Sequence, residues 1–212
     1  MASIYQLKSR FQSLLRPLTN GLAGAGITAN QVTLTAAFLS LAVGAFITYG
    51  FLHPSVFPGG YLFLLVVPLF LFIRMALNAI DGMLAREHGM QSRLGGYYNE
   101  LGDVVSDVFL YAPFAVYRLQ YGQPTLEAVA ATALFVIASV ATEVMGILAQ
   151  TTGSRRYDGP MGKSDRAFWV SLLCIYLALG GPTWPVVEIY IAGLGVLALL
   201  TVFNRARKAL SE

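Results

Sequence analysis

The stretch that decides the fold of this chain reads Asn78-Ala-Ile-Asp81-Gly82-Met-Leu-Ala85-Arg86, and it is followed by Gly95, Asn99, Asp103 and Asp107. It places polar and acidic residues at helical spacing between two long apolar runs. Because an α-helix turns by about 100° per residue, the polar residues of 74–85 share one face of a helix, and those of 99–107 share one face of the next. Carboxylate and amide oxygens that face each other in this way suit Mg²⁺, Mn²⁺ or Ca²⁺.

The composition of the chain is that of a membrane protein, since 56% of its residues are hydrophobic and only 12% are charged. A helix needs about 20 apolar residues to cross a bilayer. Runs of this kind lie near 31–51, 60–84, 97–117, 126–149, 167–182 and 185–203. We therefore predict an all-α fold, an integral membrane bundle of six transmembrane helices.

The first apolar run is preceded by an amphipathic stretch from Ile4 to Leu18 that carries Lys8, Arg10 and Arg16. It lacks the apolar segment and the cleavage site of a signal peptide. We expect residues 1–20 to form a helix on the membrane surface and residues 31–208 to form the bundle. No long linker interrupts residues 1–212, so a single domain is expected.

Basic residues predict how the chain is oriented in the membrane. They gather before the first span and after the second, fourth and sixth, whereas the opposite connections hold none apart from Arg118 at a border. Cytoplasmic segments are enriched in Lys and Arg. We therefore expect a multi-pass protein of the cytoplasmic membrane with both termini and the 78–103 motif on the cytoplasmic side, in contact with membrane lipids and not with nucleic acid.

Written out, the motif is Asn78-x2-Asp81-Gly82-x2-Ala85-Arg86-x8-Gly95-x3-Asn99-x3-Asp103. It resembles the signature of the CDP-alcohol phosphotransferase family, also called class I CDP-alcohol phosphatidyltransferases, which is D-x2-D-G-x2-A-R-x8-G-x3-D-x3-D. Every spacing agrees, and six of the eight fixed positions agree in residue type. The two departures are Asn78 and Asn99, which stand where the family has Asp.

The resemblance implies a role for each position of the motif. The metal-ligand positions are Asn78, Asp81, Asn99 and Asp103, and Asp103 is also the expected catalytic base. The donor, CDP-diacylglycerol or another CDP-alcohol, is expected at Asp81, Gly82, Ala85, Arg86 and Gly95. The alternative interpretations are a positively charged anchor for Arg86, helix packing for Gly82 and a buried structural polar network for the acidic face.

The two asparagines change the charge of the expected metal site. An amide oxygen coordinates a hard cation without adding charge, so the four ligand positions carry two negative charges where the family has four. We expect one tightly bound Mg²⁺ or Mn²⁺ and a second that is weak or absent. Glu100 and Asp107 are candidates to restore charge, and Arg74 is a candidate to neutralise phosphate in place of a metal. An alternative alignment of Asp103 and Asp107 with the last two family aspartates requires four extra loop residues.

Two further polar features lie outside the motif. The segment 155–166 carries Arg155, Arg156, Lys163 and Arg166. These four are candidates to bind the acceptor or its phosphate, or they follow from the cytoplasmic preference for positive charge alone. Glu143 lies within the fourth apolar run, so it is expected to face the interior of the bundle.

These features predict an integral membrane enzyme that transfers a substituted phosphate from a CDP-alcohol to an acceptor alcohol, with release of CMP, in phospholipid synthesis. The resemblance also implies a homodimer. The sequence does not identify the acceptor. An inactive relative that binds a lipid nucleotide or acts as a membrane scaffold is the main alternative, because of Asn78 and Asn99. A transporter is a weaker one, because paired broken helices are absent from the sequence pattern.

Overall fold

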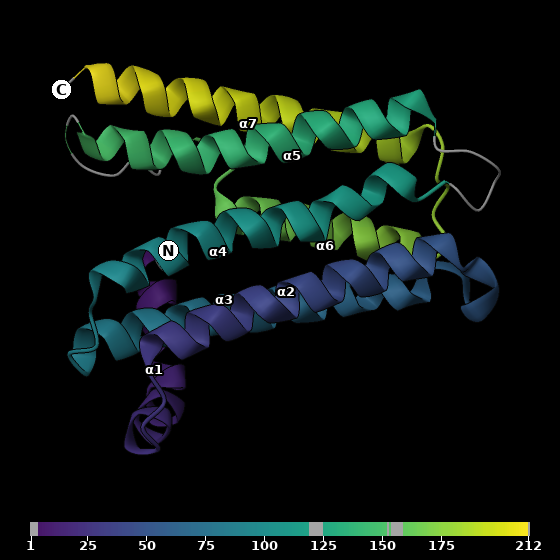
Figure 1. Ribbon diagram of the computed structural model, residues 1–212. Helices are drawn as coiled ribbons and strands as arrows, with labels where there is room; N and C mark the ends of the chain where they lie inside the picture. Colours follow the sequence, from purple (N-terminus) through teal and green to yellow (C-terminus); the bar gives the residue numbers. More distant parts are fainter. Residues whose placement is uncertain (1–3, 119–124, 152, 154–158, 212) are drawn as a thin grey trace. The chain divides into compact units, whose positions relative to one another are not determined.

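The computed structural model describes residues 4–118, 125–151, 153 and 159–211, and every regular element in these ranges is a helix. The α-helices are α1 (Ile4–Gly24), α2 (Ala29–Leu52), α3 (Val66–Glu87), α4 (Arg93–Tyr111), α5 (Leu126–Leu148), α6 (Lys163–Ala178) and α7 (Val186–Leu210), as Figure 1 shows. Short 3₁₀ helices lie at Pro54–Val56 (η1), Gly60–Leu65 (η2), Ala112–Val116 (η3) and Ala149–Thr151 (η5). The all-α prediction is confirmed.

Each predicted span contains one helix, but the count of six transmembrane helices is not confirmed. Among the described residues, four helical segments are long and apolar enough to cross a membrane: Ala29–Leu52, Gly60–Glu87, Leu126–Thr151 and Val186–Leu210. The helix α6 has only 16 residues. The helix α4 has 19 residues and carries Arg93, Glu100, Asp103 and Asp107, so its mean hydropathy is low.

The described residues form two compact units, and the boundary between them falls within α2, α3 and α4. The first unit consists of residues 4–39 and 72–103. It contains the complete 78–103 motif. The second unit consists of the described residues of 40–71 and 104–211.

The core of the first unit joins α1 and the start of α2 to α3. Ile80, Met83 and Leu84 of α3 are buried, and Leu15 and Leu22 of α1 pack against this cluster. Burial of such side chains is the main source of stability at this contact. The edge-to-face pair of Phe11 and Phe72 adds an aromatic contact, with ring centroids 6.0 Å apart.

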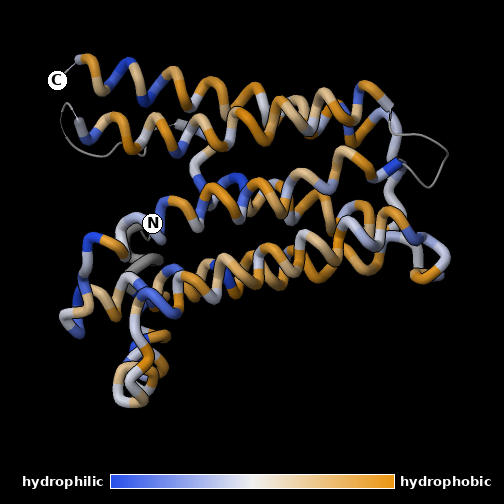
Figure 2. The backbone as a smooth tube through the Cα atoms, in the orientation of Figure 1, coloured by the Kyte–Doolittle hydropathy of each residue, from blue (hydrophilic) through white to orange (hydrophobic). Residues whose placement is uncertain are grey.

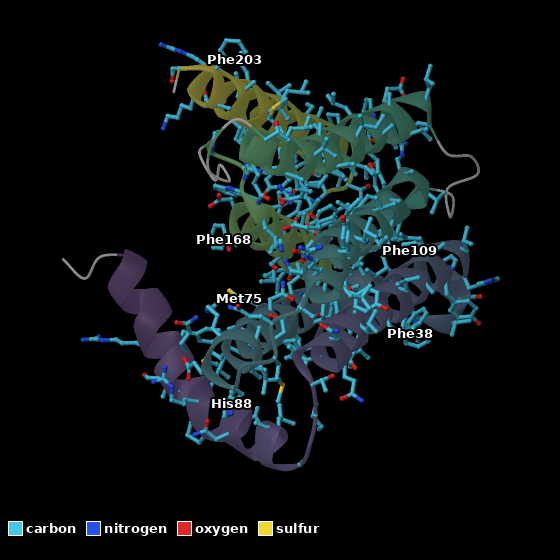
Figure 3. The ribbon with its side chains drawn as sticks, turned by 60° about the vertical axis from the view of Figure 1, so that its left-hand side comes forward. Phe38, Met75, His88, Phe109, Phe168 and Phe203 are labelled. Carbon is cyan, nitrogen blue, oxygen red and sulfur yellow. The ribbon has the colours of Figure 1, made fainter. Side chains whose placement is uncertain are left out.

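Polar contacts also tie α1 to the end of α3. Arg16 donates to both carboxylate oxygens of Glu87, at 3.0 and 2.9 Å. This hydrogen-bonded pairing raises the pKa of Arg16 above its ordinary value. One residue further along the chain, His88 Nε2 lies 3.1 Å from Asn20 Oδ1 (Figure 3 labels His88). The structure therefore has a helix over Ile4–Gly24; that it is an amphipathic helix on a membrane surface remains a prediction.

In the second unit α5 and α7 pack side by side along their length (Figure 1). The contact is close because Gly195 of α7 has no side chain: a Cβ atom there would lie 2.8 Å from Leu134 Cγ and 3.1 Å from the Phe135 backbone nitrogen. Figure 2 shows apolar residues along both helices and hydrophilic ones at the end of α7. Large apolar side chains also point outward, such as Phe203, which is 62% exposed (Figure 3).

Candidate functional site

The turn between α3 and α4 brings the two halves of the motif back toward each other. The chain leaves α3 through Gly89, whose φ of +67° lies in the left-handed region that favours glycine. Ser92 then caps α4, because its Oγ accepts a hydrogen bond of 2.9 Å from the Gly95 nitrogen. A Cβ atom on Gly95 would lie 2.6 Å from Asn30 Oδ1 of α2. The motif glycine at position 95 thus allows α2 and α4 to approach each other closely.

Asp103 of α4 is joined to α3 by two side chains. Arg74 Nη2 donates to Asp103 Oδ1 at 3.2 Å and lies 3.3 Å from the Asp103 carbonyl oxygen. Asn78 Nδ2 donates to the same Oδ1 at 3.5 Å. Arg74 and Asp103 are both buried, at 4% exposure each, so this is an ion pair inside the protein. Asn78 therefore turns the NH₂ group of its amide, not the oxygen, toward the carboxylate.

Asp81, the other acid of the motif, is bound by a residue of α2. Thr33 Oγ1 donates to Asp81 Oδ2 at 2.8 Å, and both residues are buried. The side chain of Thr33 also lies 3.1 Å from the Ala29 carbonyl oxygen. Thr33 was not identified from the sequence, because nothing in the local pattern around it indicates a partner 48 residues away.

Gly82 leaves space for the side chain of Arg86. A Cβ atom on Gly82 would lie 3.0 Å from Arg86 Nη2 and 3.2 Å from Nη1. The guanidinium group therefore folds back along the helix to Gly82, while Arg86 itself remains exposed. In the structure, the space left by Gly82 is taken by a side chain of the same motif. Ala85 is half-buried and packs against the apolar cluster of the first unit.

The groups of the first unit that could bind a metal ion come from α3 and α4. Asp81 and Asp103 are its buried motif carboxylates, Asn99 and Glu100 of α4 are half-buried, and Asn78 faces Asp103 through its amide donor. In the part of the chain that the structure describes, no three His, Cys, Asp or Glu side chains gather in a way that would hold a metal ion. Carboxylate oxygens such as those of Asp81 and Asp103 are the ligand type that a hard cation prefers.

The second unit contains a separate cluster centred on Arg166, which is fully buried. Its guanidinium group donates to Asp107 Oδ2 at 2.7 and 3.1 Å and to Glu143 Oε1 at 2.7 Å. It also donates to Thr142 Oγ1 at 2.7 Å and to the Met161 carbonyl oxygen at 3.0 Å. These five bonds use all five N–H groups of an arginine side chain. The cluster joins α4, α5 and the start of α6.

Two further contacts attach α7 to this cluster. Arg205 donates to the Thr142 carbonyl oxygen, and Thr201 Oγ1 accepts a hydrogen bond of 2.9 Å from the Met161 nitrogen. The expectation that Glu143 faces the interior is confirmed, since it is 4% exposed and ion-paired. Sequence reasoning proposed Arg166, Asp107 and Glu143 for different tasks, and the structure brings all three together.

Of the three remaining acceptor candidates, the structure describes only Lys163. Arg155 and Arg156 lie outside the described residues. Lys163 is half-buried at the first position of α6, next to Gly162, whose nitrogen donates to Asp165 Oδ2 at 3.0 Å. This contact closes the first turn of α6 and sets the position of Arg166.

Comparison with known families identifies the motif. A family model described as CDP-alcohol phosphatidyltransferase matches residues 26–203, which includes the motif and both polar clusters. The chain belongs to this family.

Two curated relatives agree with this assignment. The inner membrane protein YnbA of Escherichia coli (strain K12) is 42% identical over 210 residues, covering 98% of this chain and 96% of its own. A phosphatidylinositol phosphate synthase of Mycobacteroides abscessus is 26% identical over 198 residues, covering 93% and 84% respectively. One of these two relatives is thus an inner membrane protein, and the other is a phosphatidylinositol phosphate synthase.

Solved structures show the same fold. The phosphatidylinositol phosphate synthase of Mycobacterium tuberculosis with CDP-DAG bound has a TM-score of 0.74 at 19% identity and covers 92% of both chains. The same enzyme in complex with manganese and citrate has a TM-score of 0.74 at 18% identity, covering 92% of this chain and 88% of that one. At these identities the likeness concerns the fold alone.

Proposed function

We propose that this protein is an integral membrane transferase that moves a substituted phosphate from a CDP-alcohol, CDP-diacylglycerol in particular, to an acceptor alcohol and releases CMP. The observation that carries the proposal is the geometry of the motif within the first unit. Asp103 of α4 is bonded to Arg74 and Asn78 of α3, and Asp81 and Arg86 follow along the same α3 helix. Family membership over residues 26–203 supports the same reaction.

The proposed reaction forms one bond and breaks another at the lipid-side phosphorus of the diphosphate. The acceptor hydroxyl oxygen attacks this phosphorus, and the bond to the bridging oxygen breaks with its electron pair, which leaves on CMP. The hydroxyl proton passes to the Asp103 carboxylate and from there to water. Hydrogen bonds from Arg74 and Asn78 fix the orientation of that carboxylate, as a general base requires.

In this proposal, positively charged groups hold the diphosphate of the donor, and helices that approach each other closely form the site around it. The exposed guanidinium group of Arg86 offers paired N–H donors to the diphosphate oxygens. Asp81, held by Thr33, and Asp103 would bind one Mg²⁺ or Mn²⁺, which supplies positive charge to the phosphate oxygens when bound. The family signature also assigns Gly95 to donor binding, and here its role is to let α2 and α4 approach each other.

We assign acceptor recognition to the segment 155–166. The guanidinium group of Arg166 is bonded inside the protein, so we assign the anionic acceptor to the other basic residues of this segment, Arg155, Arg156 and Lys163. Asp107 and Glu143 then serve as partners of Arg166. Glu100 remains an auxiliary acidic group beside Asn99.

The proposed setting is the cytoplasmic membrane, with both termini and the motif on the cytoplasmic side. The distribution of Lys and Arg supports this orientation, and the Escherichia coli relative is an inner membrane protein. We further propose that residues 1–212 act as one catalytic domain, with α4 and α6 as the two shorter of six spans, and that the protein is a homodimer.

One observation favours a second function. Asn78, Asn99 and the Arg74–Asp103 ion pair leave the motif with less negative charge than the family signature has. A protein with such a site is able to bind a lipid nucleotide without turning it over. It would then act as a binding protein or scaffold.

Measurement of CMP release separates these two functions. The purified protein in lipid nanodiscs is given CDP-diacylglycerol, Mg²⁺ or Mn²⁺, and a panel of acceptors that includes glycerol phosphate, inositol phosphate, serine and simple polyols. The transferase releases CMP with at least one acceptor and forms the matching phospholipid. Saturable binding of the donor without CMP release under any of these conditions would instead establish the binding protein.

A further inference from the structure

The ion pair between Arg74 and Asp103 occupies part of the expected metal site. The guanidinium nitrogen lies 3.2 Å from Asp103 Oδ1, and both side chains are almost fully shielded from water, at 5% and 6% side-chain exposure. A divalent cation bound at Oδ1 would have to approach a fixed positive charge at close range. Like charges this near to each other, in a site with little water, repel strongly.

The amide of Asn78 points to the same conclusion. Its NH₂ group is directed at Asp103 Oδ1 at 3.5 Å. The opposite orientation would set the amide oxygen against a carboxylate oxygen, and these two acceptors repel. An Asp in this position would repel Asp103 in the same way unless a cation lay between the two carboxylates. The pairing observed here needs no such cation, because Arg74 and Asn78 both present hydrogen-bond donors to Asp103.

The formal charges of the buried group are consistent with this arrangement. Asp81, Asp103 and the half-buried Glu100 contribute three negative charges and Arg74 one positive charge, which leaves −2. One divalent ion then neutralises the group, whereas a second would bring it to +2 before the diphosphate is bound. The residues present therefore do not fit a site for two divalent ions.

We propose that Arg74 takes the place of the second divalent ion, as a fixed internal cation that holds Asp103 ionised and oriented between α3 and α4. The inference rests on the proposed function and deepens it, since it makes this chain a one-metal member of a family whose signature supplies four aspartates. Arg74 acts through Asp103, so it is a positioning residue. Its positive charge is essential, and its removal is compensated only by another cation bound at the same carboxylate.

A charge exchange tests the proposal through metal stoichiometry, which is measured without turnover. Mn²⁺ bound per protein is counted by electron paramagnetic resonance for the wild type, for Asn78→Asp with Asn99→Asp, for the same pair combined with Arg74→Gln, and for Arg118→Gln as the control. Arg118 forms an ion pair with Glu188 at 3.4 Å in the second unit, so the control also removes a paired charge. We expect one Mn²⁺ in the wild type, in the control and in the double variant, which keeps Arg74, and two in the triple variant.

Activity gives a second readout. Arg74→Gln alone is expected to lower kcat by about a hundredfold, the usual effect of removing one electrostatic group from an active site. Arg74→Lys, which keeps the charge and avoids an unpaired buried carboxylate, is expected to retain part of the activity, and the triple variant to recover activity only at raised Mn²⁺. A merely structural role of Arg74 would lower kcat without any change in the number of ions.

Three results would overturn the proposal: two Mn²⁺ bound to the wild type, two bound to the double variant that keeps Arg74, or an unchanged ion count in the triple variant. Failure of the proposed function looks different. In that case the wild type releases no CMP from any donor, while the ion counts still show whether Arg74 excludes a second cation.

Discussion

At the scale of single residues, Arg166 shows how strongly a buried charge depends on its partners. All five of its N–H groups are bonded to oxygen atoms of α4, α5 and the segment before α6. Replacement by Met would leave the Asp107 and Glu143 carboxylates buried without their cation. Loss of one partner from such a buried pair costs about 3–5 kcal/mol.

We therefore expect Arg166→Met to lower the free energy of unfolding by about 3–5 kcal/mol, as measured by chemical denaturation in detergent micelles. Arg207→Met is the matched control, because Arg207 is exposed in the last turn of α7. Its stability should stay close to that of the wild type. If the two variants were equally stable, Arg166 would not be the structural centre of the cluster.

Gly82 and Arg86 allow function to be separated from stability at the same scale. In Gly82→Ala the new methyl group meets only the flexible end of Arg86, and alanine favours the helix by about 1 kcal/mol. This variant should fold at least as well as the wild type but bind CDP-diacylglycerol more weakly, because the guanidinium group is displaced.

Arg86→Lys should weaken donor binding as well, by about tenfold or more, because it loses the forked donor. Isothermal titration with CDP-diacylglycerol in nanodiscs measures both variants, and Arg10→Lys on α1 is the control. Unchanged donor affinity in both motif variants would assign Gly82 and Arg86 to helix packing and membrane anchoring instead.

At the scale of elements, the sequence predicted where helices lie along the chain better than which residues of different helices contact each other. Each predicted apolar run overlaps an α-helix of the described residues, because burial in lipid or protein requires apolar side chains, but only four helical segments there are long and apolar enough to cross a membrane. The start of α6 at Lys163 was missed by four residues, although Gly162 and Asp165 form the contact that begins it. The partners of Arg166 lie 59 and 23 residues away in sequence, and no local pattern reports such contacts. The contact between Thr33 and Asp81, 48 residues apart, likewise leaves no local pattern in the sequence.

The helix α1 is expected to lie on the membrane surface, since Leu14 and Leu18 are 78% and 54% exposed while other residues of α1 contact α3. Spin labels at Leu14→Cys and, as a control, Ser13→Cys test this in lipid vesicles. Cys174 is fully buried and should stay unlabelled. Oxygen should reach the label at 14 more readily than the label at 13. Equal access to oxygen and to a water-soluble relaxer at both positions would place α1 in solvent.

At the scale of the whole molecule, the distribution of positive charge predicts the topology. The basic segments before α2 and at the end of α7 should both be cytoplasmic. Green fluorescent protein fused to either terminus should therefore fluoresce, and alkaline phosphatase fused to either terminus should be inactive. An active C-terminal phosphatase fusion would mean an odd number of spans and would refute the six-span bundle.

The central claim is that this variant motif still transfers phosphate from a CDP-alcohol. The most direct test compares CMP release from CDP-diacylglycerol by the wild type, Asp103→Asn and Asp81→Asn, with and without a chelator, after circular dichroism has shown that all three are folded. We predict CMP release by the wild type that stops on chelation, returns with Mg²⁺ or Mn²⁺, and falls by at least about a hundredfold in both variants. CMP release that is the same in Asp103→Asn as in the wild type, or that survives chelation, would contradict this account.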